Sequence, residues 1–432
     1  MNNTTNIKNI LENKINNIVK KLYNIDVNSI LSIPPQKDLG DFASNVAFII
    51  SKDLQKTTQD IAHEIKDQLN ENVKELIEKV EIAGPGFLNI FIKSESLFKM
   101  LLNIDNDYGT STALHPKRII VEMGDPNTHK APHVGHLFSY LCGDSIARLL
   151  ISQGNEIKKV TYRSDVGMGV AMCLYFWIKD GRKEPETLKD KVLLLQLCYQ
   201  KGRELYEEEN EKAEIIKLNS MLYEEGSTIH LDWLKTREWC LNYYKELENS
   251  LGIHSQQNYL ESMVAEEGLK VVKEHIRDVF IESEGAIIFP GEKYGLHSRV
   301  FITKQGTPTY EAKDLGLVIK KMQDWPFDLT IIPTAHEQNA YFEVLIMSIS
   351  KALPQYIGKI KHIGFGMVSM KTGRIRSRTG NGLNAITLIE SVQKKIEILI
   401  NSRDNIPENE KPDIIEKISM GAIKYAFLKI YL

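Results

Sequence analysis

The sequence is short of cysteine, of net charge and of long apolar runs, and each shortage excludes a class of protein. Its 432 residues contain four cysteines and no C-x-x-C pair, which excludes a zinc ribbon or a thioredoxin-type motif. The 54 basic and 57 acidic residues give a net charge of −3, so any polyanion must be bound by a local basic surface. No apolar run reaches about 20 residues, so no membrane-spanning helix is predicted. The polar N-terminus lacks the apolar core of a signal peptide, and we expect a cytoplasmic protein with reduced thiols.

The length allows two to four domains at roughly 100–200 residues each. Residues 1–93 read as a small α/β domain. Apolar spacing predicts a first helix from Ile7 to Val19 and a second from Phe42 to Leu54, and Thr58 is expected to cap a third helix. Gly84-Pro85-Gly86 predicts a turn between two short strands.

The sequence pattern changes at about residue 115, where alternating strand and helix signals begin. Arg118–Glu122 is a buried strand type, and a loop ending at Pro132 separates it from a helix that reaches Leu150. A second strand follows at Lys158–Tyr162, so the segment predicts a βαβ unit of a parallel sheet. Open parallel sheets bind ligands at the carboxyl ends of their strands.

The remaining chain is divided by the same patterns. We expect a mostly helical insertion at about residues 170–285 within a core domain of residues 115–383. Further strands are predicted at 286–289, 299–303 and 329–332. Residues 384–432 are helical and end inside an apolar helix with no stop signal, so we expect that further sequence normally follows.

The most informative segment lies between the first core strand and its helix. Pro132 keeps the preceding chain out of the helical conformation, so His133 and His136 fall on the first helical turn and share a face. Gly135 removes a side chain where a planar base or a ribose could approach. A helix N-terminus offers free N–H groups and partial positive charge, and two imidazoles there can donate to a phosphate.

Other interpretations of these histidines are open. His129, His133 and His136 could be metal ligands, or incidental surface residues. No G-x-x-x-x-G-K-[ST] string occurs, so a P-loop ATPase is excluded at the level of the motif.

A second segment, residues 364–381, concentrates basic residues in a glycine-punctuated loop. Lys371, Arg374, Arg376 and Arg378 could stabilise the charge of a reacting polyphosphate, or they could form a solvated basic turn.

Together these segments resemble the arginyl-tRNA synthetases, a family of class I aminoacyl-tRNA synthetases. His133-Val-Gly-His136 is similar to the HIGH motif, and Arg374-Ile-Arg-Ser-Arg378 stands where the KMSKS-type loop lies. Further matching stretches are 40–45, 80–91, 126–136, 282–286 and 421–425, so the resemblance runs nearly end to end. Two departures are Gly124-Asp125, where the family has small hydroxyl residues, and Arg374 and Arg378, where it has lysines.

The resemblance implies a fold and a set of roles. The fold is α/β: a Rossmann-type parallel-sheet catalytic core, a tRNA-contacting N-terminal domain and the start of a truncated anticodon-binding domain. The implied catalytic residues are Lys130, His133, His136, Arg374 and Arg378, and the implied ATP-binding residues are His133, Gly135, His136, Arg374, Arg376 and Arg378. The implied arginine-binding residues are Glu122, Asn127, Tyr310, Asp314 and Gln338.

A guanidinium is planar, carries five donors and is always charged, so its pocket needs carboxylates and an aromatic or apolar wall. By the resemblance, Glu122 and Asp314 bind the guanidinium, Tyr310 packs on the side chain, and Asn127 and Gln338 hold the α-amino end. Asp125 could pair with the substrate ammonium or displace the amino acid.

The expected reaction is the activation of L-arginine by ATP with Mg²⁺ and transfer to the terminal adenosine of tRNA(Arg). We expect no tightly bound protein metal, no membrane association and a monomer. Two alternatives are open: a non-catalytic or truncated tRNA-binding paralogue, and an adenylate-forming enzyme of the same superfamily with another substrate.

Overall fold

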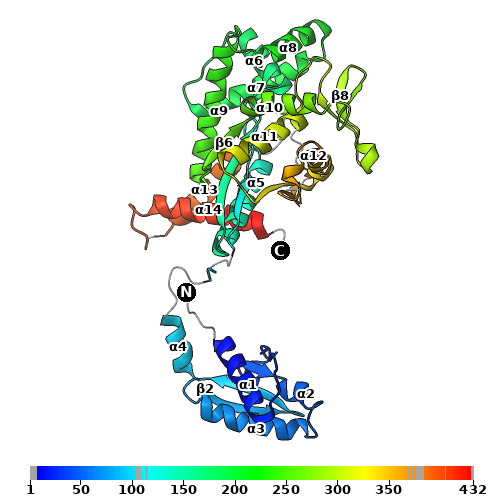
Figure 1. The fold of residues 1–432 in the computed structure, drawn as a ribbon. Helices are drawn as coiled ribbons and strands as arrows, with labels where there is room; N and C mark the ends of the chain where they lie inside the picture. The colour runs from blue at the N-terminus through cyan, green and yellow to red at the C-terminus, as the bar shows by residue number, and fades with distance from the viewer. Residues whose placement is uncertain are drawn as a thin grey trace. The chain divides into compact units, whose positions relative to one another are not determined.

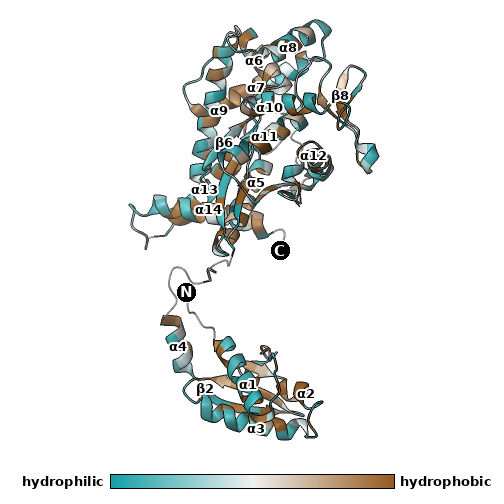
Figure 2. Cartoon of the chain, viewed as in Figure 1, coloured by the Kyte–Doolittle hydropathy of each residue, from teal (hydrophilic) through white to brown (hydrophobic). Residues whose placement is uncertain are grey.

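The computed structural model describes residues 7–102, 109–111, 115–366, 369–370, 373–374, 384–403 and 405–429. The chain divides into two compact units, Met1–Gly109 and Thr110–Leu432 (Figure 1). In both units the helices carry hydrophobic and hydrophilic residues side by side, as expected of helices that pack on a core by one face (Figure 2). Within the described residues, no helix combines the length and the apolarity needed to cross a membrane.

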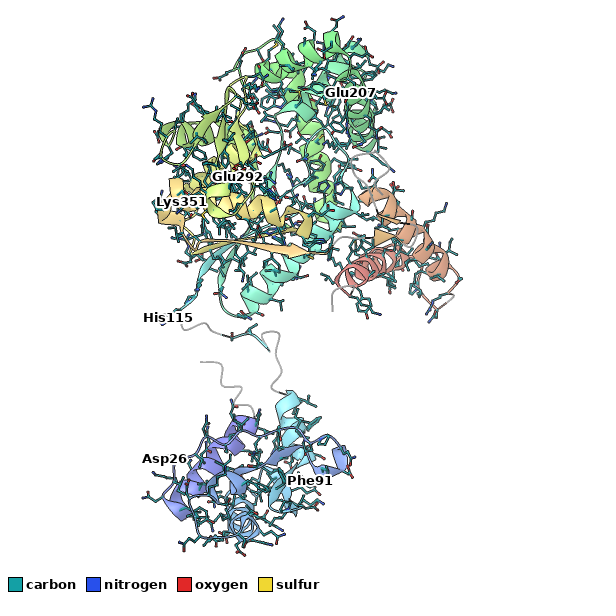
Figure 3. All side chains as sticks on the ribbon, turned by 90° about the vertical axis from the view of Figure 1, so that its right-hand side faces the viewer. Asp26, Phe91, His115, Glu207, Glu292 and Lys351 are labelled. Atoms are coloured by element: carbon teal, nitrogen blue, oxygen red, sulfur yellow. The ribbon has the colours of Figure 1, made fainter. Side chains whose placement is uncertain are left out.

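The first unit is a three-stranded antiparallel sheet, of order β1-β3-β2, packed against helices. Its elements are α1 (Ile7–Tyr23), η1 (Lys37–Leu39), β1 (Phe42–Ser44), α2 (Val46–Ile50), α3 (Thr58–Asn72), β2 (Ile77–Ala83), β3 (Phe87–Ile92) and α4 (Ser94–Leu102). Apolar residues of α1 and α3 share one core with those of the sheet. On the outer side, Lys79 Nζ lies 4.4 Å from the ring centroid of Phe91, which Figure 3 labels.

Two predictions for the first unit were wrong. Phe42–Ser44 is a strand that pairs with β3, because the edge of the sheet offers backbone partners that a local apolar pattern cannot reveal. The helix begins only at Val46, whose N–H donates to Ser44 Oγ at 3.2 Å. The cap of α3 is Thr57, one residue before the predicted Thr58.

The second unit contains the predicted parallel sheet, which has five strands in the order β11-β10-β4-β5-β6, all neighbours parallel. The strands are β4 (Arg118–Glu122), β5 (Glu156–Arg163), β6 (Gln257–Leu260), β10 (Leu329–Ala335) and β11 (Ile360–Phe365). Ile119 and Val121 of β4 pack toward α5 (Val134–Ser152), and Ile120 belongs to the core on the other face. That second core includes residues of α10 (Glu261–Glu274), α11 (Tyr310–Asp324) and α12 (Asn339–Ala352). The α/β fold class is therefore confirmed.

Four helices form a separate layer with its own core: α6 (Met168–Lys179), α7 (Leu188–Leu205), α8 (Glu209–Met221) and α9 (His230–Ser250). The range expected to be helical, 170–285, also contains a strand of the main sheet, since β6 pairs with β5. A four-residue strand has too little pattern of its own to be recognised between helices.

The predicted strands at 286–289 and 299–303 do not join the parallel sheet. They form a small antiparallel sheet of β7 (Ile281–Ser283), β8 (Ala286–Phe289) and β9 (Arg299–Ile302), with η2 (Gly291–Tyr294) between the last two. Lys351, at the end of α12, places its Nζ 5.0 Å from the ring of Tyr294 (Figure 3).

The remaining described elements lie near the end of the chain or connect strands. They are η3 (His336–Gln338), η4 (Pro354–Tyr356), β12 (Ser369–Met370), β13 (Gly373–Arg374), α13 (Ala385–Asn401) and α14 (Lys411–Lys429). Apolar residues of α13 and α14 pack with Leu137, Phe138 and Leu141 of α5, so the C-terminal helices are part of this unit's core (Figure 1).

Candidate active site

Several predicted site residues follow the strands at which the order of the parallel sheet reverses. From β4 the chain proceeds through β5 and β6 on one side, and β10 and β11 lie on the other side of β4. The carboxyl ends of β4 and β10 are therefore adjacent, and crevices at such switch points are the usual ligand sites of open parallel sheets. Glu122 ends β4, and Gln338 lies in η3 directly after β10.

The loop after β4 has an unusual backbone that brings it close to α5 and β5. Gly124 has φ +83°, and a Cβ there would lie 2.2 Å from the ring of Tyr140, so only glycine fits. Asp125 (φ +48°) and His129 (φ +62°) also adopt the left-handed region. The Tyr162 N–H donates to Asp125 Oδ1 at 2.7 Å, which ties the loop to β5.

The two predicted imidazoles cap α5. His133 is the N-cap residue, its Nδ1 accepting from the Gly135 N–H at 3.1 Å, and His136 Nδ1 accepts from the His133 N–H at 3.1 Å. The rings stack with centroids 3.7 Å apart. A Cβ on Gly135 would lie 2.9 Å from the His133 ring, so this glycine makes room for the stacked imidazole.

The capping bonds fix the tautomers of both histidines. Because each Nδ1 accepts a backbone N–H, the proton of the neutral ring is on Nε2 and can be donated outward. Burial, assisted by the charge of Lys130, lowers the pKa of His133 to about 4. Burial and His133 also lower the pKa of His136. The N-terminus of α5 thus presents two neutral N–H donors at the positive end of the helix dipole.

Lys130 and Asn127 are held by the helical layer. Lys130 Nζ lies 3.9 Å from the ring centroid of Tyr199 on α7. The Tyr244 hydroxyl lies 2.7 Å from the carbonyl oxygen of Asn127 and 2.8 Å from that of Lys130. The backbone on either side of Thr128 and His129 is therefore held in place by the Tyr244 side chain of α9.

Asp314 carries a half-buried carboxylate with an unusual electrostatic environment. The Tyr341 hydroxyl donates to its Oδ2 at 2.6 Å, and among the described residues no cation lies within ion-pair distance of it. Burial, with a contribution from the negative charge of Glu122, raises the pKa of Asp314 to about 8. One turn earlier on α11, the Tyr310 side chain is 55% exposed.

Glu122 differs from Asp314 because it already has a cationic partner. Its carboxylate forms a buried ion pair with the ammonium group of Lys321, at the far end of α11. The negative charge of Glu122 acts on the pKa of Asp314, so the two carboxylates lie close enough to interact electrostatically. Burial and Glu122 also raise the pKa of Asp125 well above its ordinary value.

For the remaining predicted residues, the structure shows few side-chain contacts or does not describe the position. Gln338 is exposed, and the backbone of Arg374 lies in the β12–β13 hairpin. Lys371, Arg376 and Arg378 lie outside the described residues. Both ring nitrogens of His129 are bonded to threonine hydroxyls, which speaks against the alternative that it is a metal ligand.

Sequence reasoning did not identify Lys321, Tyr341, Tyr244 or the partners of His129. Lys321 stands seven residues after Asp314, which puts both on the same face of a helix, so its position was a usable signal. Tyr341 and Tyr244 come from distant helices, and no local pattern marks them.

Residues 97–430 match the family described as tRNA synthetases class I (R), catalytic domain, and residues 5–92 match the arginyl tRNA synthetase N-terminal domain. The chain is 32% identical over 433 residues to the arginine–tRNA ligase of Borreliella burgdorferi, covering 96% of this chain and 72% of that protein. It is 30% identical over 449 residues to the arginine–tRNA ligase of Borrelia turicatae, covering 98% and 75%.

Solved structures agree on the fold. The arginyl-tRNA synthetase of Thermus thermophilus matches with a TM-score of 0.67 at 20% identity, covering 98% of this chain and 75% of that one. The enzyme of Plasmodium falciparum matches with a TM-score of 0.62 at 20% identity, covering 97% and 73%.

Proposed function

Because the chain belongs to the arginine-type class I tRNA synthetases, we propose that it joins L-arginine to tRNA(Arg) in an ATP-dependent reaction. Its relatives are named arginine–tRNA ligases, and proteins of that kind use ATP, arginine and tRNA as substrates. The carboxylate of arginine attacks the α-phosphate of ATP, pyrophosphate leaves, and the arginyl group passes from AMP to a ribose hydroxyl of the terminal adenosine. This chemistry requires no protein nucleophile, so positioning and charge stabilisation dominate.

The observation that carries the choice of amino acid is the half-buried carboxylate of Asp314, which has no cationic partner within ion-pair distance among the described residues. A carboxylate in this state gains most from a ligand that brings its own fixed positive charge. We assign the guanidinium to Asp314, with the exposed Tyr310 ring one turn away as the wall for the aliphatic part. A substrate amino acid with a neutral side chain would leave the Asp314 carboxyl group either protonated or without a cationic partner.

Glu122 has a different role in this proposal. Since Lys321 already neutralises it, its carboxylate is oriented before the substrate arrives and offers hydrogen-bond acceptors without adding a full uncompensated charge. Asn127 and Gln338 would hold the α-amino end. Asp125 Oδ1 already accepts a hydrogen bond from the Tyr162 N–H. The other carboxylate oxygen, Oδ2, is therefore the one that could bind the substrate ammonium.

ATP is assigned to the N-terminus of α5. His133 and His136 would donate from Nε2 to phosphate oxygens, and Lys130 would add a positive charge to the same region. Magnesium bound to ATP would neutralise the outer phosphates as part of the substrate. Gly135 with Arg374, Arg376 and Arg378 completes the proposed nucleotide site, by resemblance to the family.

The domain assignment is proposed in the same way. Residues 1–93 would contact tRNA, residues 115–383 would carry out catalysis, and residues 384–432 would lead toward an anticodon-binding domain. A cytoplasmic monomer remains our expectation.

The test is ATP–pyrophosphate exchange by the intact chain, with tRNA(Arg) present and each of the twenty amino acids supplied separately. We expect exchange with arginine above all others, and arginylation of tRNA in a parallel assay. Exchange supported best by another amino acid would assign a different substrate. No exchange with any amino acid, together with retained binding of tRNA, would instead support a non-catalytic tRNA-binding protein.

A further inference from the structure

One face of α9 contacts both loops that follow the two central strands β4 and β5. The face consists of Trp233, Thr236, Arg237, Cys240 and Tyr244, spaced so that all five lie within one stripe of the helix. Four of the five are fully or almost fully buried, and none of the five is exposed. These side chains therefore act on the loops and not on solvent.

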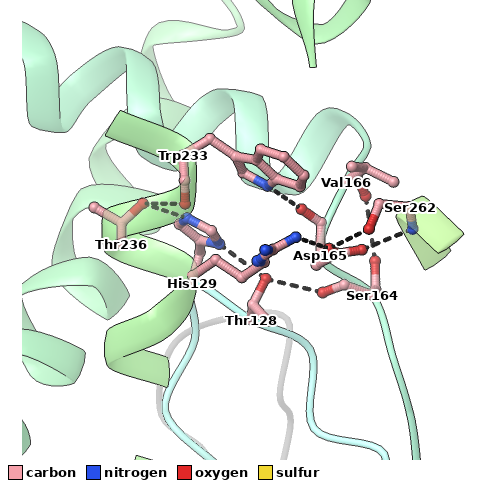
Figure 4. Close-up of polar contacts among 9 residues, drawn as sticks. Thr128, His129, Ser164, Asp165, Val166, Trp233, Thr236 and Ser262 are labelled. Atoms are coloured by element: carbon pink, nitrogen blue, oxygen red, sulfur yellow. Dashed lines mark hydrogen bonds and ion pairs between the residues drawn. The ribbon is translucent and has the colours of Figure 1, made fainter. Parts of the chain in front are cut away.

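The loop after β4 is bound by three residues of this face that lie on successive turns of α9, namely Thr236, Cys240 and Tyr244. His129 Nε2 lies 2.9 Å from Thr236 Oγ1 (Figure 4). The His129 N–H donates to Cys240 Sγ at 3.1 Å. One helical turn further on, the Tyr244 hydroxyl reaches the carbonyl oxygens of Asn127 and Lys130. The loop segment that carries Asn127 and Lys130 is thus fixed on both sides.

The loop after β5 is held by the other end of the stripe. Trp233 Nε1 donates to the Asp165 carbonyl oxygen at 2.7 Å, and Arg237 Nη1 donates to Asp165 Oδ2 at 3.1 Å (Figure 4). Ser262, at the start of α10, donates to the same carboxylate through its N–H and its hydroxyl. The two loops also bond to each other, because the Thr128 N–H donates to the Ser164 carbonyl oxygen at 2.9 Å.

The direction of the His129–Thr236 bond follows from the second contact of the Thr236 hydroxyl. The Thr236 hydroxyl donates to the Asp232 carbonyl oxygen at 2.8 Å, so its oxygen accepts from His129 Nε2–H. His129 Nδ1 lies 2.9 Å from the Thr128 hydroxyl, whose single proton can go either to this nitrogen or to the Ser164 carbonyl oxygen, 3.0 Å away. The ring is completely buried, and burial lowers its pKa to about 3, so the ring is neutral.

His129 also holds a backbone conformation that is unfavourable by itself. Its φ of +62° lies in the left-handed region, where a residue other than glycine costs of order 1 kcal/mol and persists only when its surroundings fix it. The bonds to Thr236 and Cys240 supply that constraint. Without them, the loop would relax toward other conformations and would carry Asn127 and Lys130 with it.

We propose that His129 is a positioning residue of the active site, and that the His129–Thr236 bond to α9 holds the loop after β4 in the geometry that arginine activation requires. The proposal rests on the proposed function, because Asn127 and Lys130 were assigned there to arginine and ATP. His129 has no exposed atoms with which to touch substrate, so its effect is transmitted through the loop.

The test compares Thr236→Val, which removes the acceptor at nearly constant shape, with Thr236→Ser, which keeps it. The matched control is Thr330→Val in β10, the same replacement at a buried threonine whose hydroxyl has no partner among the described residues. A fourth variant, His129→Asn, tolerates the left-handed backbone but is too short to reach Thr236.

Two measurements are made on each variant. In arginine-dependent exchange with tRNA present, we expect Thr236→Val and His129→Asn to lower kcat/KM by about ten- to a hundredfold, with a raised KM for arginine. Thr236→Ser and Thr330→Val should stay within about threefold of the unmodified chain. Loss of folded protein would lower the apparent kcat and leave KM unchanged, so the change in KM separates positioning from stability.

Amide hydrogen exchange of residues 123–133 is measured in parallel and needs no activity. We expect faster exchange of this segment in Thr236→Val and protection as in the unmodified chain for Thr236→Ser. The positioning proposal is overturned if Thr236→Val keeps the KM for arginine, if Thr236→Ser is equally impaired, or if exchange of the segment does not change. If the unmodified chain shows no arginine-dependent exchange, the proposed function fails, and hydrogen exchange alone decides whether the bond holds the loop.

Discussion

Replacing Asp314 by asparagine should stabilise the second unit (residues 110–432) at pH 8 and remove its response to arginine. In the folded chain, burial raises the pKa of Asp314 to about 8, whereas an unfolded aspartate titrates near 3.9. Between these pH values the folded state binds a proton that the unfolded state has lost. The contribution of Asp314 to stability therefore falls as the pH rises from about 4 to about 8.

The size of the effect follows from the same two values. Each pH unit between them corresponds to about 1.4 kcal/mol, which gives on the order of 5 kcal/mol at pH 8 as an upper bound. Relaxation around the carboxylate reduces this figure, and we expect a gain of about 2–4 kcal/mol for Asp314→Asn at pH 8. At pH 4.5 the gain should fall below about 1 kcal/mol, because the folded carboxyl is then neutral and this pH is close to the pKa of the unfolded aspartate.

Urea unfolding followed by tryptophan fluorescence is the suitable assay. All four tryptophans, Trp177, Trp233, Trp239 and Trp325, lie in the second unit, so the signal reports that unit alone. The control is Asp413→Asn, which removes an exposed carboxylate paired with Lys417 and should change stability by less than about 1 kcal/mol. Millimolar arginine should raise the midpoint of the unmodified chain and not that of Asp314→Asn.

A lower stability of Asp314→Asn than of the unmodified chain at pH 8, or a stability difference that does not depend on pH, would contradict an elevated pKa of Asp314. The binding of arginine by Asp314 is refuted if arginine stabilises the variant as strongly as the unmodified chain.

Three further changes follow from the site. His136→Ala should lower arginine-dependent ATP–pyrophosphate exchange by about 10²–10³ with tRNA present, since one donor to the reacting phosphate is lost, and an unchanged rate would exclude His136 from the mechanism. Lys321→Met should lower the free energy of unfolding by about 3–5 kcal/mol because Glu122 is left buried without its partner, and adding Glu122→Gln should restore most of it; no recovery would contradict the ion pair. Gly124→Ala should cost clearly more than Gly181→Ala, which has a similar φ of +80° but no atom within 4 Å of the new Cβ, and equal costs in urea unfolding would contradict the close approach of Tyr140.

The parts of the site that could be predicted from sequence are those defined by local chemistry. Pro132 and the histidine spacing placed His133 and His136 at the start of α5, because a helix start is determined within a few residues. The strand β4 was predicted with its observed bounds, because a short apolar run next to a glycine- and proline-containing loop is a strong local signal. The resemblance added Asp314 and Tyr310, which no pattern within α11 would have singled out.

The parts that could not be predicted depend on distant partners. The neutralisation of Glu122 requires Lys321, 199 positions away, so no local pattern could show that the carboxylate predicted to bind the guanidinium already has a cationic partner. The role of His129 depends on Thr236, 107 positions away, so it was considered only as a metal ligand or an incidental residue. Strand β6 was missed inside a helical region, because its only reason to be extended is the open edge of β5.

The recognition of a guanidinium by Asp314 is tested most directly by replacing L-arginine with L-citrulline, which keeps the shape of the side chain and lacks its charge. With tRNA(Arg) present, kcat/KM for ATP–pyrophosphate exchange should be at least about a hundredfold lower with citrulline than with arginine, since a desolvated charge pair is lost. In Asp314→Asn that preference should shrink to less than about tenfold. Equal use of the two amino acids by the unmodified chain, or an undiminished preference in Asp314→Asn, would contradict recognition of the charge by this carboxylate.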